Sequence, residues 1–518
     1  MSVSLGGFRK TRTEDQQPLL VDEDVALGPV FGIDLGTSYS RISVMKDGLV
    51  EIIPDAHGSH STPSWVAFTN ETHLIGVAAM NQYLENPHRT IFDISLQKRI
   101  IGRKFEDQSL QQDIKRFPFK IFDNGGQPRI SVEINGNEAT FAPEEILSMV
   151  LGRLKDIAAN YLGEPVRRAV ITVPAYFNDA QRAATKEAGR MADIDVLRVV
   201  NEPTAAALAY RLDETNQTEP ETYTFGLDKT SYEGQVLVYD LGAKTVDISI
   251  ISIEEGVFEV RSTAGDSHIG GESFNDRVMI DMAEKYSKDY NVDITKDPTT
   301  MGKLRGEVDT AKKHLSSQES TTISIEYNGQ NMSESLTRAQ FEALNGDLLQ
   351  KTSQYVRQAL GDAKMKTSDI DHIILAGGSS HIVKVQQMLE HLFGKTPRNE
   401  IDPEDVVAIG AAIQGSYLAD SGRDYGCYFG ETSFTSLGVE APNGVMVPLI
   451  KRGTTLPTKK IHTFSTSANN QSIFPIRVYE GERARTEDNH KLAEFQLDIP
   501  QVTTSLLAGD YTLTSITD

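Results

Sequence analysis

The sequence contains a single cysteine, Cys427, among its 518 residues. A disulfide within the chain is therefore impossible, and a zinc site built from several cysteines is excluded. Long apolar runs are also missing from the first 30 residues, where the longest, Pro-Leu-Leu-Val at 18–21, is too short for a secretory signal or a membrane span. The last four residues, 515–518, are not a retention tetrapeptide. These absences predict a cytoplasmic protein with no membrane partner and a disordered N-terminal tail at 1–29.

Basic residues are scarce relative to acidic ones. The chain has 51 Lys and Arg against 73 Asp and Glu, which gives a formal net charge of −22 at pH 7. Such a balance repels nucleic-acid backbones and anionic membranes, so we expect no nucleic-acid partner. A nucleotide site remains compatible with this charge, because a binding pocket can be locally positive.

The pattern of apolar residues divides the chain into two parts. From 30 to 418, short β-rich runs alternate with helical patterns, as in the strand candidate 169–174 followed by the helix candidate 178–192. This alternation predicts an α/β domain. Beyond about 432, alternating runs read as strands without helices between them, which predicts a partial β-sandwich at 434–518. The segment 419–433, rich in Gly, Asp and Tyr, is predicted to be a linker.

An internal repeat lies within the α/β part. The run 31–44, Phe-Gly-Ile-Asp-Leu-Gly-Thr-Ser-Tyr-Ser-Arg-Ile-Ser-Val, recurs at 237–250 as Leu-Val-Tyr-Asp-Leu-Gly-Ala-Lys-Thr-Val-Asp-Ile-Ser-Ile. Each copy has an apolar strand, Asp-Leu-Gly, small polar residues and a second apolar run. Two copies predict two similar lobes, each presenting a hairpin turn toward a shared cleft.

These turns carry the residue types that bind a triphosphate. Glycine turns let backbone N–H groups approach phosphates closely. Asp34 and Asp240 end their strands and can hold a hydrated magnesium ion through its waters. Two further glycine turns follow, at 265–272 and 373–380. A P-loop is absent, because the sequence Gly242-Ala-Lys-Thr245 lacks the earlier glycine of that motif.

The ordered motifs resemble those of the seventy-kilodalton heat-shock chaperones. They are Asp-Leu-Gly-Thr-Ser-Tyr at 34–39, Val-Pro-Ala-Tyr-Phe-Asn at 173–178, Asn-Glu-Pro-Thr-Ala-Ala-Ala at 201–207, Asp-Leu-Gly at 240–242, Gly-Gly-Glu at 270–272 and Gly-Gly-Ser at 377–379. The resemblance covers about 31–497, and the runs 90–94 and 315–318 are most similar to the endoplasmic-reticulum branch. It implies an actin-like two-lobe ATPase domain, with ATP or ADP and Mg²⁺ as cofactors, followed by a β-sandwich that binds unfolded or extended hydrophobic peptides. J-domain co-chaperones and nucleotide-exchange factors are the implied partners. The endoplasmic reticulum is an alternative location, by branch resemblance only.

The same resemblance assigns roles to individual residues. It implies that Asp34, Glu202, Asp240 and Thr245 take part in catalysis and in holding the waters of the magnesium ion. Phosphate contacts fall to Gly36, Thr37, Ser38, Tyr39, Gly242, Ala243 and Lys244, with Gly270, Gly271 and Glu272 near the ribose and phosphates. The adenosine falls to Lys312, Ser316, Gly377, Gly378 and Ser379, with Asp309, Lys313, His381 and Glu404 at the adenine clamp. Pro174 and Arg182 would relay the nucleotide state, and the peptide cleft would be lined by Val439, Phe464, Phe474 and Ile476.

Several positions depart from the family pattern. Met80 stands where the family has its catalytic lysine, and a thioether cannot donate a hydrogen bond to a phosphoryl group. We therefore expect weak ATP hydrolysis. Ala243 and Lys244 replace glycines, so a positive φ there would be strained. Lys244 either compensates for the charge missing at Met80 or points to solvent.

The adenine clamp and the β-module also differ. Lys313 and His381 replace two stacking arginines, and lysine stacks less well than a guanidinium, so we expect reduced nucleotide affinity. The linker lacks the family's leucine run, and the resemblance leads us to expect a β-module that is short of one or two strands and of the helical lid. Phe474, beside Pro475, either fills the peptide cleft or packs in the core.

Two functions stay open at this stage. One is a chaperone relative with a weak ATPase. The other is a non-cycling nucleotide-binding scaffold that partners another chaperone. An actin-fold sugar kinase is a distant third, because the β-module and the run 173–177 speak against it.

Overall fold

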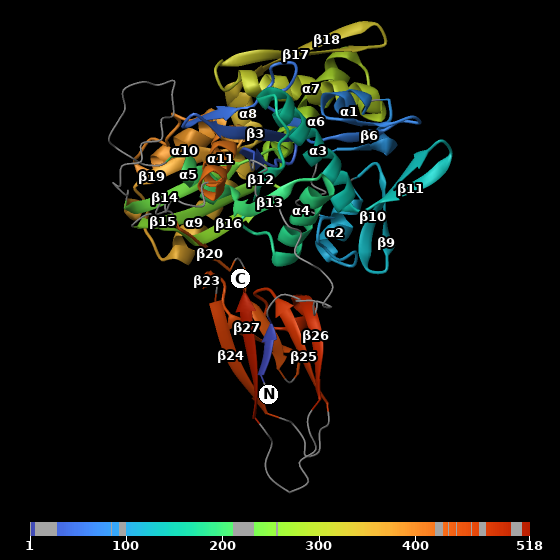
Figure 1. The fold of residues 1–518 in the computed structure, drawn as a ribbon. Coiled ribbons are helices and arrows are strands. Elements are labelled where there is room, and N and C mark those ends of the chain that lie inside the picture. Colours follow the sequence, from blue (N-terminus) through green and yellow to red (C-terminus); the bar gives the residue numbers. More distant parts are fainter. Residues whose placement is uncertain are drawn as a thin grey trace. The chain divides into compact units, whose positions relative to one another are not determined.

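The computed structural model describes residues 2–5, 28–83, 85–92, 100–115, 117–210, 233–254, 257–419, 428–433, 435–441, 443–456, 458–465, 473–498 and 510–517. Contacts divide the chain into two compact units (Figure 1). The larger unit comprises Gly28–Gly256 and Thr263–Cys427, and the smaller comprises Met1–Leu27, Val257–Ser262 and Tyr428–Asp518. Within the described ranges, no helix is both long and apolar enough to cross a bilayer.

The first sheet of the larger unit contains the first copy of the repeat. Its strand order is β13 (Asp195–Asn201), β12 (Arg168–Val173), β2 (Val30–Asp34), β3 (Tyr39–Lys46) and β4 (Leu49–Ile52). β2 pairs in parallel with β12 and antiparallel with β3. Phe31 and Ile33 are fully buried, as expected for strands of a sheet that is covered by helices. The helices of this lobe are α2 (Gln108–Ile114), α3 (Pro143–Leu162) and α4 (Asp179–Met191).

The second sheet repeats this arrangement. β14 (Gly234–Leu241) pairs in parallel with β19 (His372–Ala376) and antiparallel with β15 (Val246–Glu254), which β16 (Val257–Asp266) follows along the chain. Each copy of the repeat is thus a hairpin whose first strand also has a parallel neighbour, so the predicted duplication is confirmed. The core beside this sheet includes Tyr239, Phe274 and Tyr286, all fully buried. The helices of this lobe are α6 (Gly271–Tyr290), α7 (Pro298–His314), α8 (Arg338–Leu344), α9 (Gly346–Ala363) and α10 (Val383–Phe393).

Two apolar helices join the lobes. α5 (Glu202–Ala209) packs against β14, and α11 (Val406–Ala419) packs against β2, β3 and β12. The two helices also pack on each other, closely enough that a Cβ at Gly410 would overlap the carbonyl of Ala205. Both helices are buried on nearly every side, which explains why their sequences show no polar face.

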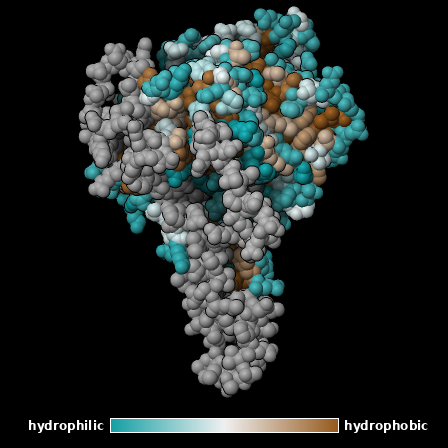
Figure 2. Space-filling view, in the orientation of Figure 1, coloured by the Kyte–Doolittle hydropathy of each residue, from teal (hydrophilic) through white to brown (hydrophobic). Residues whose placement is uncertain are grey.

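Small sheets complete the larger unit. They contain β6 (Val66–Phe68), β7 (His73–Ile75), β8 (Thr90–Ile91), β9 (Lys120–Asn124), β10 (Gln127–Ile134), β11 (Asn137–Phe141), β17 (Ser320–Tyr327) and β18 (Gln330–Thr337). The short strand β5 (Thr62–Pro63) pairs with β3 of the first sheet. The helix α1 (Val77–Gln82) lies beside β6 and β7. On the face that Figure 2 shows, apolar side chains of the described surface form small patches among polar ones.

The smaller unit is built from strands. An antiparallel sheet has the order β22 (Val445–Ile450), β21 (Leu437–Ala441), β25 (Ile473–Glu480) and β26 (His490–Asp498). A second sheet contains β24 (Thr458–Ser465), β27 (Asp510–Thr517) and β1 (Ser2–Leu5), and two further strands are β20 (Tyr428–Thr432) and β23 (Thr455–Leu456). Residues 2–5 of the predicted tail therefore form a strand.

Two of the four predicted peptide-cleft residues are core residues of this unit. Val439 and Ile476 are only 2% and 4% exposed and pack together with four partly buried apolar neighbours. Phe464 and Phe474 belong to β24 and β25, but their side chains lie outside the described residues. The choice between cleft filling and core packing at Phe474 therefore stays open.

Candidate nucleotide site

The first predicted phosphate turn connects β2 and β3. Asp34, the last residue of β2, pairs with Arg41 across the hairpin. A Cβ at Gly36 would overlap the carbonyl oxygen of Tyr39, so only glycine fits this bend. The hydroxyl of Ser64 donates a hydrogen bond of 3.0 Å to the Gly36 carbonyl. The turn is therefore supported from the neighbouring segment rather than by its own backbone alone.

The second predicted turn connects β14 and β15. Asp240 pairs with Asp247 in register, at the position that corresponds to the pairing of the first hairpin. The N–H of Gly242 donates to the carbonyl of Thr245 at 3.0 Å and closes the turn. Gly270 packs on this turn, because a Cβ at Gly270 would lie 2.5 Å from the Cα atom of Lys244.

The two residues that replace glycines in the second turn do not strain its backbone. Neither Ala243 nor Lys244 has a positive φ, so their side chains are tolerated. The N-terminus of α6 fixes the turn instead. The N–H of Gly271 donates to the Gly242 carbonyl at 3.0 Å, and the N–H of Glu272 donates to the Ala243 carbonyl at 2.7 Å.

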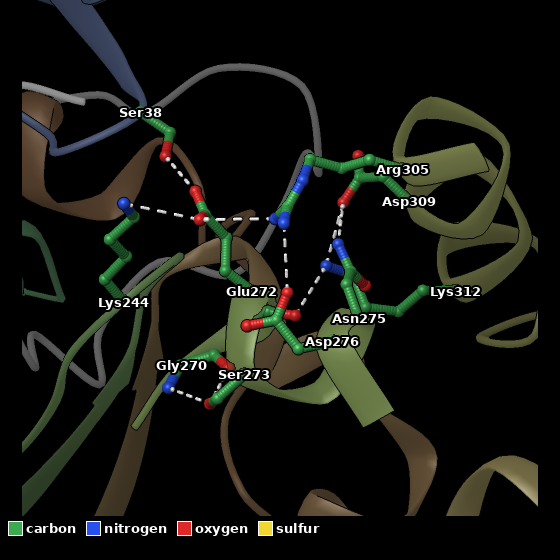
Figure 3. Close-up of polar contacts among 11 residues, drawn as sticks. Ser38, Lys244, Gly270, Glu272, Ser273, Asn275, Asp276, Arg305, Asp309 and Lys312 are labelled. Carbon is green, nitrogen blue, oxygen red and sulfur yellow. Dashed lines mark hydrogen bonds and ion pairs between the residues drawn. The ribbon is translucent and has the colours of Figure 1, made fainter. Parts of the chain in front are cut away.

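The two turns meet at one carboxylate (Figure 3). The hydroxyl of Ser38, from the first turn, donates to Oε1 of Glu272 at 3.3 Å. The ammonium of Lys244, from the second turn, lies 3.3 Å from Oε2 of the same side chain. Arg305 on α7 approaches this oxygen at 3.9 Å and is held by Asp276 at 3.1 Å. Glu272 is therefore the point where the predicted phosphate residues of both lobes converge.

Lys244 does not point to solvent, which removes one of the two alternatives for it. Its side chain is only 16% exposed. Burial lowers the pKa of its ammonium, and the neighbouring Glu272 carboxylate opposes that shift. Met80 lies half-buried on α1 and supplies no charge. The positive charge of this region thus comes from the second turn and from α7.

The three predicted catalytic carboxylates end or begin core elements. The hydroxyl of Thr172 donates to Oδ1 of Asp34 at 3.5 Å. Asp240 ends β14, and a Cβ at Gly377 would lie 2.6 Å from its Oδ1. Glu202 opens α5 and is only 3% exposed. Among the described residues, no three His, Cys, Asp or Glu side chains gather to hold a metal directly. Magnesium binding through water therefore stays a prediction.

The nucleoside residues predicted on three elements lie together. The ammonium of Lys312 donates to the carbonyl of Gly271 at 3.3 Å. A Cβ at Gly271 would lie 2.9 Å from that ammonium and would overlap the hydroxyl of Ser379. A Cβ at Gly378 would lie 2.5 Å from Oε1 of Glu404. The start of α6, the end of α7 and the turn after β19 thus form one close-packed group, in which glycine is required at 271 and 378.

The four residues predicted at the adenine clamp form ion pairs. Lys313 pairs with Asp309 at 3.1 Å. His381 pairs with Asp402 at 3.3 Å, and Glu404 pairs with Arg41. Asp402 lies two residues earlier, and its carboxylate also accepts the backbone N–H of Glu404 at 2.9 Å.

The pKa of Asp309 is lowered by its neighbours. Burial would raise its pKa, but the ammonium groups of Lys312 and Lys313 and the amide of Asn275 outweigh burial and hold the pKa well below its usual range. The group is therefore an ionised acceptor that orients Lys312 toward Gly271.

The other predicted site residues lie in or beside these turns. Thr37 and Thr245 are buried, Tyr39 is 38% exposed at the start of β3, and the N–H of Ser316 donates to the Lys313 carbonyl after α7. The predicted relay residue Arg182 donates to the carbonyl of Phe177 at 3.1 Å and to Oδ1 of Asn201 at 2.5 Å. Arg182 thus links the segment that begins at Pro174 to the residue before Glu202.

Sequence reasoning missed two side chains near the site. Arg41 pairs with Glu404, in the segment before α11. Tyr83, just after α1, stacks edge-on against Trp65 with ring centroids 5.5 Å apart. Burial raises the pKa of Tyr83, the charge of Arg305 opposes that rise, and the charge of Glu272 adds to it. Arg41 could have been found from the sequence, because it lies in the repeat at the position that faces Asp34 across the hairpin. Tyr83 lies in no motif or repeat that would have indicated it.

Comparison with known proteins agrees with this geometry. The family model described as Hsp70 protein matches residues 30–504. The heat shock 70 kDa protein 2 of Paracoccidioides lutzii is 46% identical over 477 residues, which cover 91% of this chain and 70% of that protein. The range matched by the family model includes the two repeat hairpins, the α6 turn and the Gly-Gly-Ser turn. The chain therefore belongs to the Hsp70 family.

Proposed function

We propose that this Hsp70 relative binds magnesium ATP or ADP between its two hairpin turns and hydrolyses ATP slowly. One observation carries the proposal: Ser38 and Lys244, from different lobes, both contact Glu272, and the nucleoside group of Gly271 and Lys312 adjoins it. Hydroxyl, ammonium and backbone groups of opposite lobes are thereby gathered at one place, which suits a ligand with several phosphates.

The residues present fit such a ligand. Gly271, Gly377 and Gly378 lie so close to neighbouring residues that a side chain on any of them would overlap those residues and disturb the turns. Thr37, Ser38 and Thr245 offer hydroxyl donors, and Lys312 offers an ammonium. Magnesium ATP, when bound, supplies the phosphoanhydride to be cleaved. Asp34, Asp240 and Glu202 would orient the metal's waters, which agrees with their places at the ends of β2 and β14 and the start of α5.

Calorimetric titration of the purified chain tests this proposal. We expect ATP and ADP to bind in the presence of magnesium, with lower affinity than a family member that keeps both clamp arginines. Absence of binding at millimolar nucleotide would overturn the proposal.

Slow hydrolysis is proposed because Met80 cannot stabilise the charge that develops on the transferring phosphoryl group. Loss of one such donor commonly costs on the order of 10²–10³ in rate. Lys244 could compensate only if its ammonium left Glu272 for the phosphates. Under compensation, Lys244→Gly lowers both ATP affinity and single-turnover rate, and adding Met80→Lys restores them. Without it, Lys244→Gly leaves the rate unchanged and Met80→Lys alone raises it tenfold or more.

The proposed cellular role is ATP-dependent folding of other proteins, with weak binding of extended hydrophobic peptides by the smaller unit. J-domain proteins and nucleotide-exchange factors are the proposed partners, and the cytoplasm is the proposed location. Similarity to the endoplasmic-reticulum branch at 90–94 and 315–318 keeps that compartment as the alternative. The relative reported above is named only as heat shock 70 kDa protein 2.

Met80 specifically favours a second candidate, a nucleotide-binding scaffold that no longer cycles. Stimulation of turnover by a J-domain protein separates the two. A rate that rises with added J-domain favours the chaperone cycle. Tight nucleotide binding with an unchanged, negligible rate favours the scaffold.

A further inference from the structure

We propose that the carboxylate of Glu272 is a built-in anion that competes with the phosphates of a nucleotide for the residues of both turns. The inference rests on the proposed function and concerns how the same site is regulated. Its basis is the set of three groups around this side chain: the Ser38 hydroxyl, the Lys244 ammonium and, farther away, the Arg305 guanidinium (Figure 3).

The first step is the chemistry of these groups. A hydroxyl, an ammonium and a guanidinium are the donors with which proteins hold phosphate oxygens. Here they converge on a carboxylate that comes from the first turn of α6. A carboxylate presents two anionic oxygens, and the Oε1 and Oε2 atoms of Glu272 contact different lobes. Glu272 therefore satisfies the donors that the phosphates would otherwise satisfy.

The second step is the burial of Lys244. Its side chain is 16% exposed, whereas that of Glu272 is 35% exposed. A buried ammonium without a counter-ion is costly, so a neighbouring anion stabilises the charged form of Lys244. Glu272 supplies it within the chain. A polyphosphate carries more negative charge than one carboxylate, so it can replace Glu272 as the counter-ion of Lys244.

The third step concerns the link between lobes. Ser38 follows β2 in the first lobe, and Glu272 and Lys244 belong to the second. The hydrogen bond between Ser38 and Glu272 therefore connects the two lobes without a ligand. Exchange of Glu272 for phosphates would preserve the charge balance at Lys244 while releasing this side chain toward solvent. Nucleotide affinity is then the difference between two sets of contacts, and weakening the internal set raises it.

The test compares Glu272→Gln with the unmodified chain by calorimetry, using ATP, ADP, inorganic tripolyphosphate and adenosine. Glutamine keeps the size of the side chain and removes its charge. We expect affinity for the three phosphate ligands to rise about tenfold, which corresponds to ~1.4 kcal/mol, and affinity for adenosine to stay unchanged. Glu284→Gln is the matched control, because Glu284 is an exposed carboxylate farther along α6, and its replacement should leave affinity unchanged.

Thermal melting without ligand serves as the folding check, since Glu272→Gln leaves Lys244 without its counter-ion. If that variant fails to fold, Glu272→Asp retains a charge and withdraws it by one methylene, and a smaller rise in affinity is expected. If the unmodified chain binds ATP but the folded variants bind tripolyphosphate no more tightly than it does, the role proposed for Glu272 is wrong while the proposed function stands. Failure of the unmodified chain and of every variant to bind nucleotide would overturn the proposed function as well.

Discussion

Arg41 on β3 forms an ion pair with Glu404, and its Nε atom lies 3.1 Å from Oδ1 of Asp405. Glu404 in turn packs against the backbone of the predicted nucleoside turn, since a Cβ at Gly378 would lie 2.5 Å from its Oε1 atom. Because Arg41 is the register partner of Asp34, one side chain connects the first phosphate hairpin to the nucleoside turn. This connection places Arg41 as a positioning residue rather than a contact residue for the nucleotide.

Replacement of Arg41 should therefore affect the nucleoside more than the phosphates. Arg41→Met removes a side chain that is only 12% exposed and leaves two carboxylates close together. We expect a loss of about 2 kcal/mol in the free energy of unfolding, measured by urea denaturation. Adenosine affinity should fall while tripolyphosphate affinity is unchanged.

Arg190→Met is the control for that change, since Arg190 forms an exposed pair with Glu187. Its effect on unfolding should be below about 0.5 kcal/mol. Equal losses of adenosine and tripolyphosphate affinity in Arg41→Met would contradict a positioning role at the nucleoside turn.

Gly271→Ala should abolish nucleotide binding. The added Cβ would overlap the Ser379 hydroxyl and approach the Lys312 ammonium at 2.9 Å, which displaces two predicted adenosine residues. Gly306→Ala is the matched control on α7, because no atom lies within 4 Å of a Cβ at that position. It should leave affinity intact and stabilise the helix by roughly 0.5–1 kcal/mol. Undiminished ATP binding by Gly271→Ala, measured by calorimetry, would show that the nucleoside lies elsewhere.

Acid should destabilise the protein partly through Asp309. The folded-state pKa of this carboxyl is lower than its ordinary value of 3.8, so its contribution to stability is complete above that value and is lost as the pH falls below it. We expect the free energy of unfolding to decline less steeply between pH 5 and pH 2 in Asp309→Asn than in the unmodified chain. The exposed Asp289 on α6 provides the control, and Asp289→Asn should follow the unmodified curve.

Peptide binding by the smaller unit should be weak. If Phe474 fills the predicted cleft, Phe474→Val will strengthen binding of a fluorescent heptapeptide of hydrophobic sequence. Ile476→Val introduces the same residue elsewhere on β25 with the loss of one methylene, at a residue that is 4% exposed in the core, and should lower stability without strengthening binding. A low-micromolar Kd for the unmodified chain would show that the cleft is not filled.

The sequence predicted the duplicated hairpins well, because the repeat 31–44 and 237–250 encodes strand, turn and strand locally. Glycine positions such as Gly36 and Gly271 were also predictable, since close backbone approach leaves no room for a side chain. The ion-pair partners of Lys244 and His381 were not predictable. A sequence pattern does not show which distant residue a side chain contacts, and the pairing of Arg41 with Glu404, for example, spans 363 positions.

The backbone path at Ala243 and Lys244 was not predictable for a related reason. Replacement of glycine shows that a side chain is present, but it does not show the backbone path. Here the turn closes through Gly242 and Thr245 and is held by the start of α6, a segment about thirty residues later. No local pattern in the turn contains that support.

The position of α11 has a consequence for synthesis of the chain. This helix covers β2 and β3, the first strands of the larger unit, and the Ser43 hydroxyl donates to the Ala408 carbonyl across 365 positions of sequence. At a translation rate of about 5–20 residues per second, β3 leaves the ribosome roughly 20–70 seconds before the helix that covers it. During that interval the faces of β2 and β3 that α11 covers in the folded protein lack this helix, so the first sheet can complete its core only after residues 406–419 have been made.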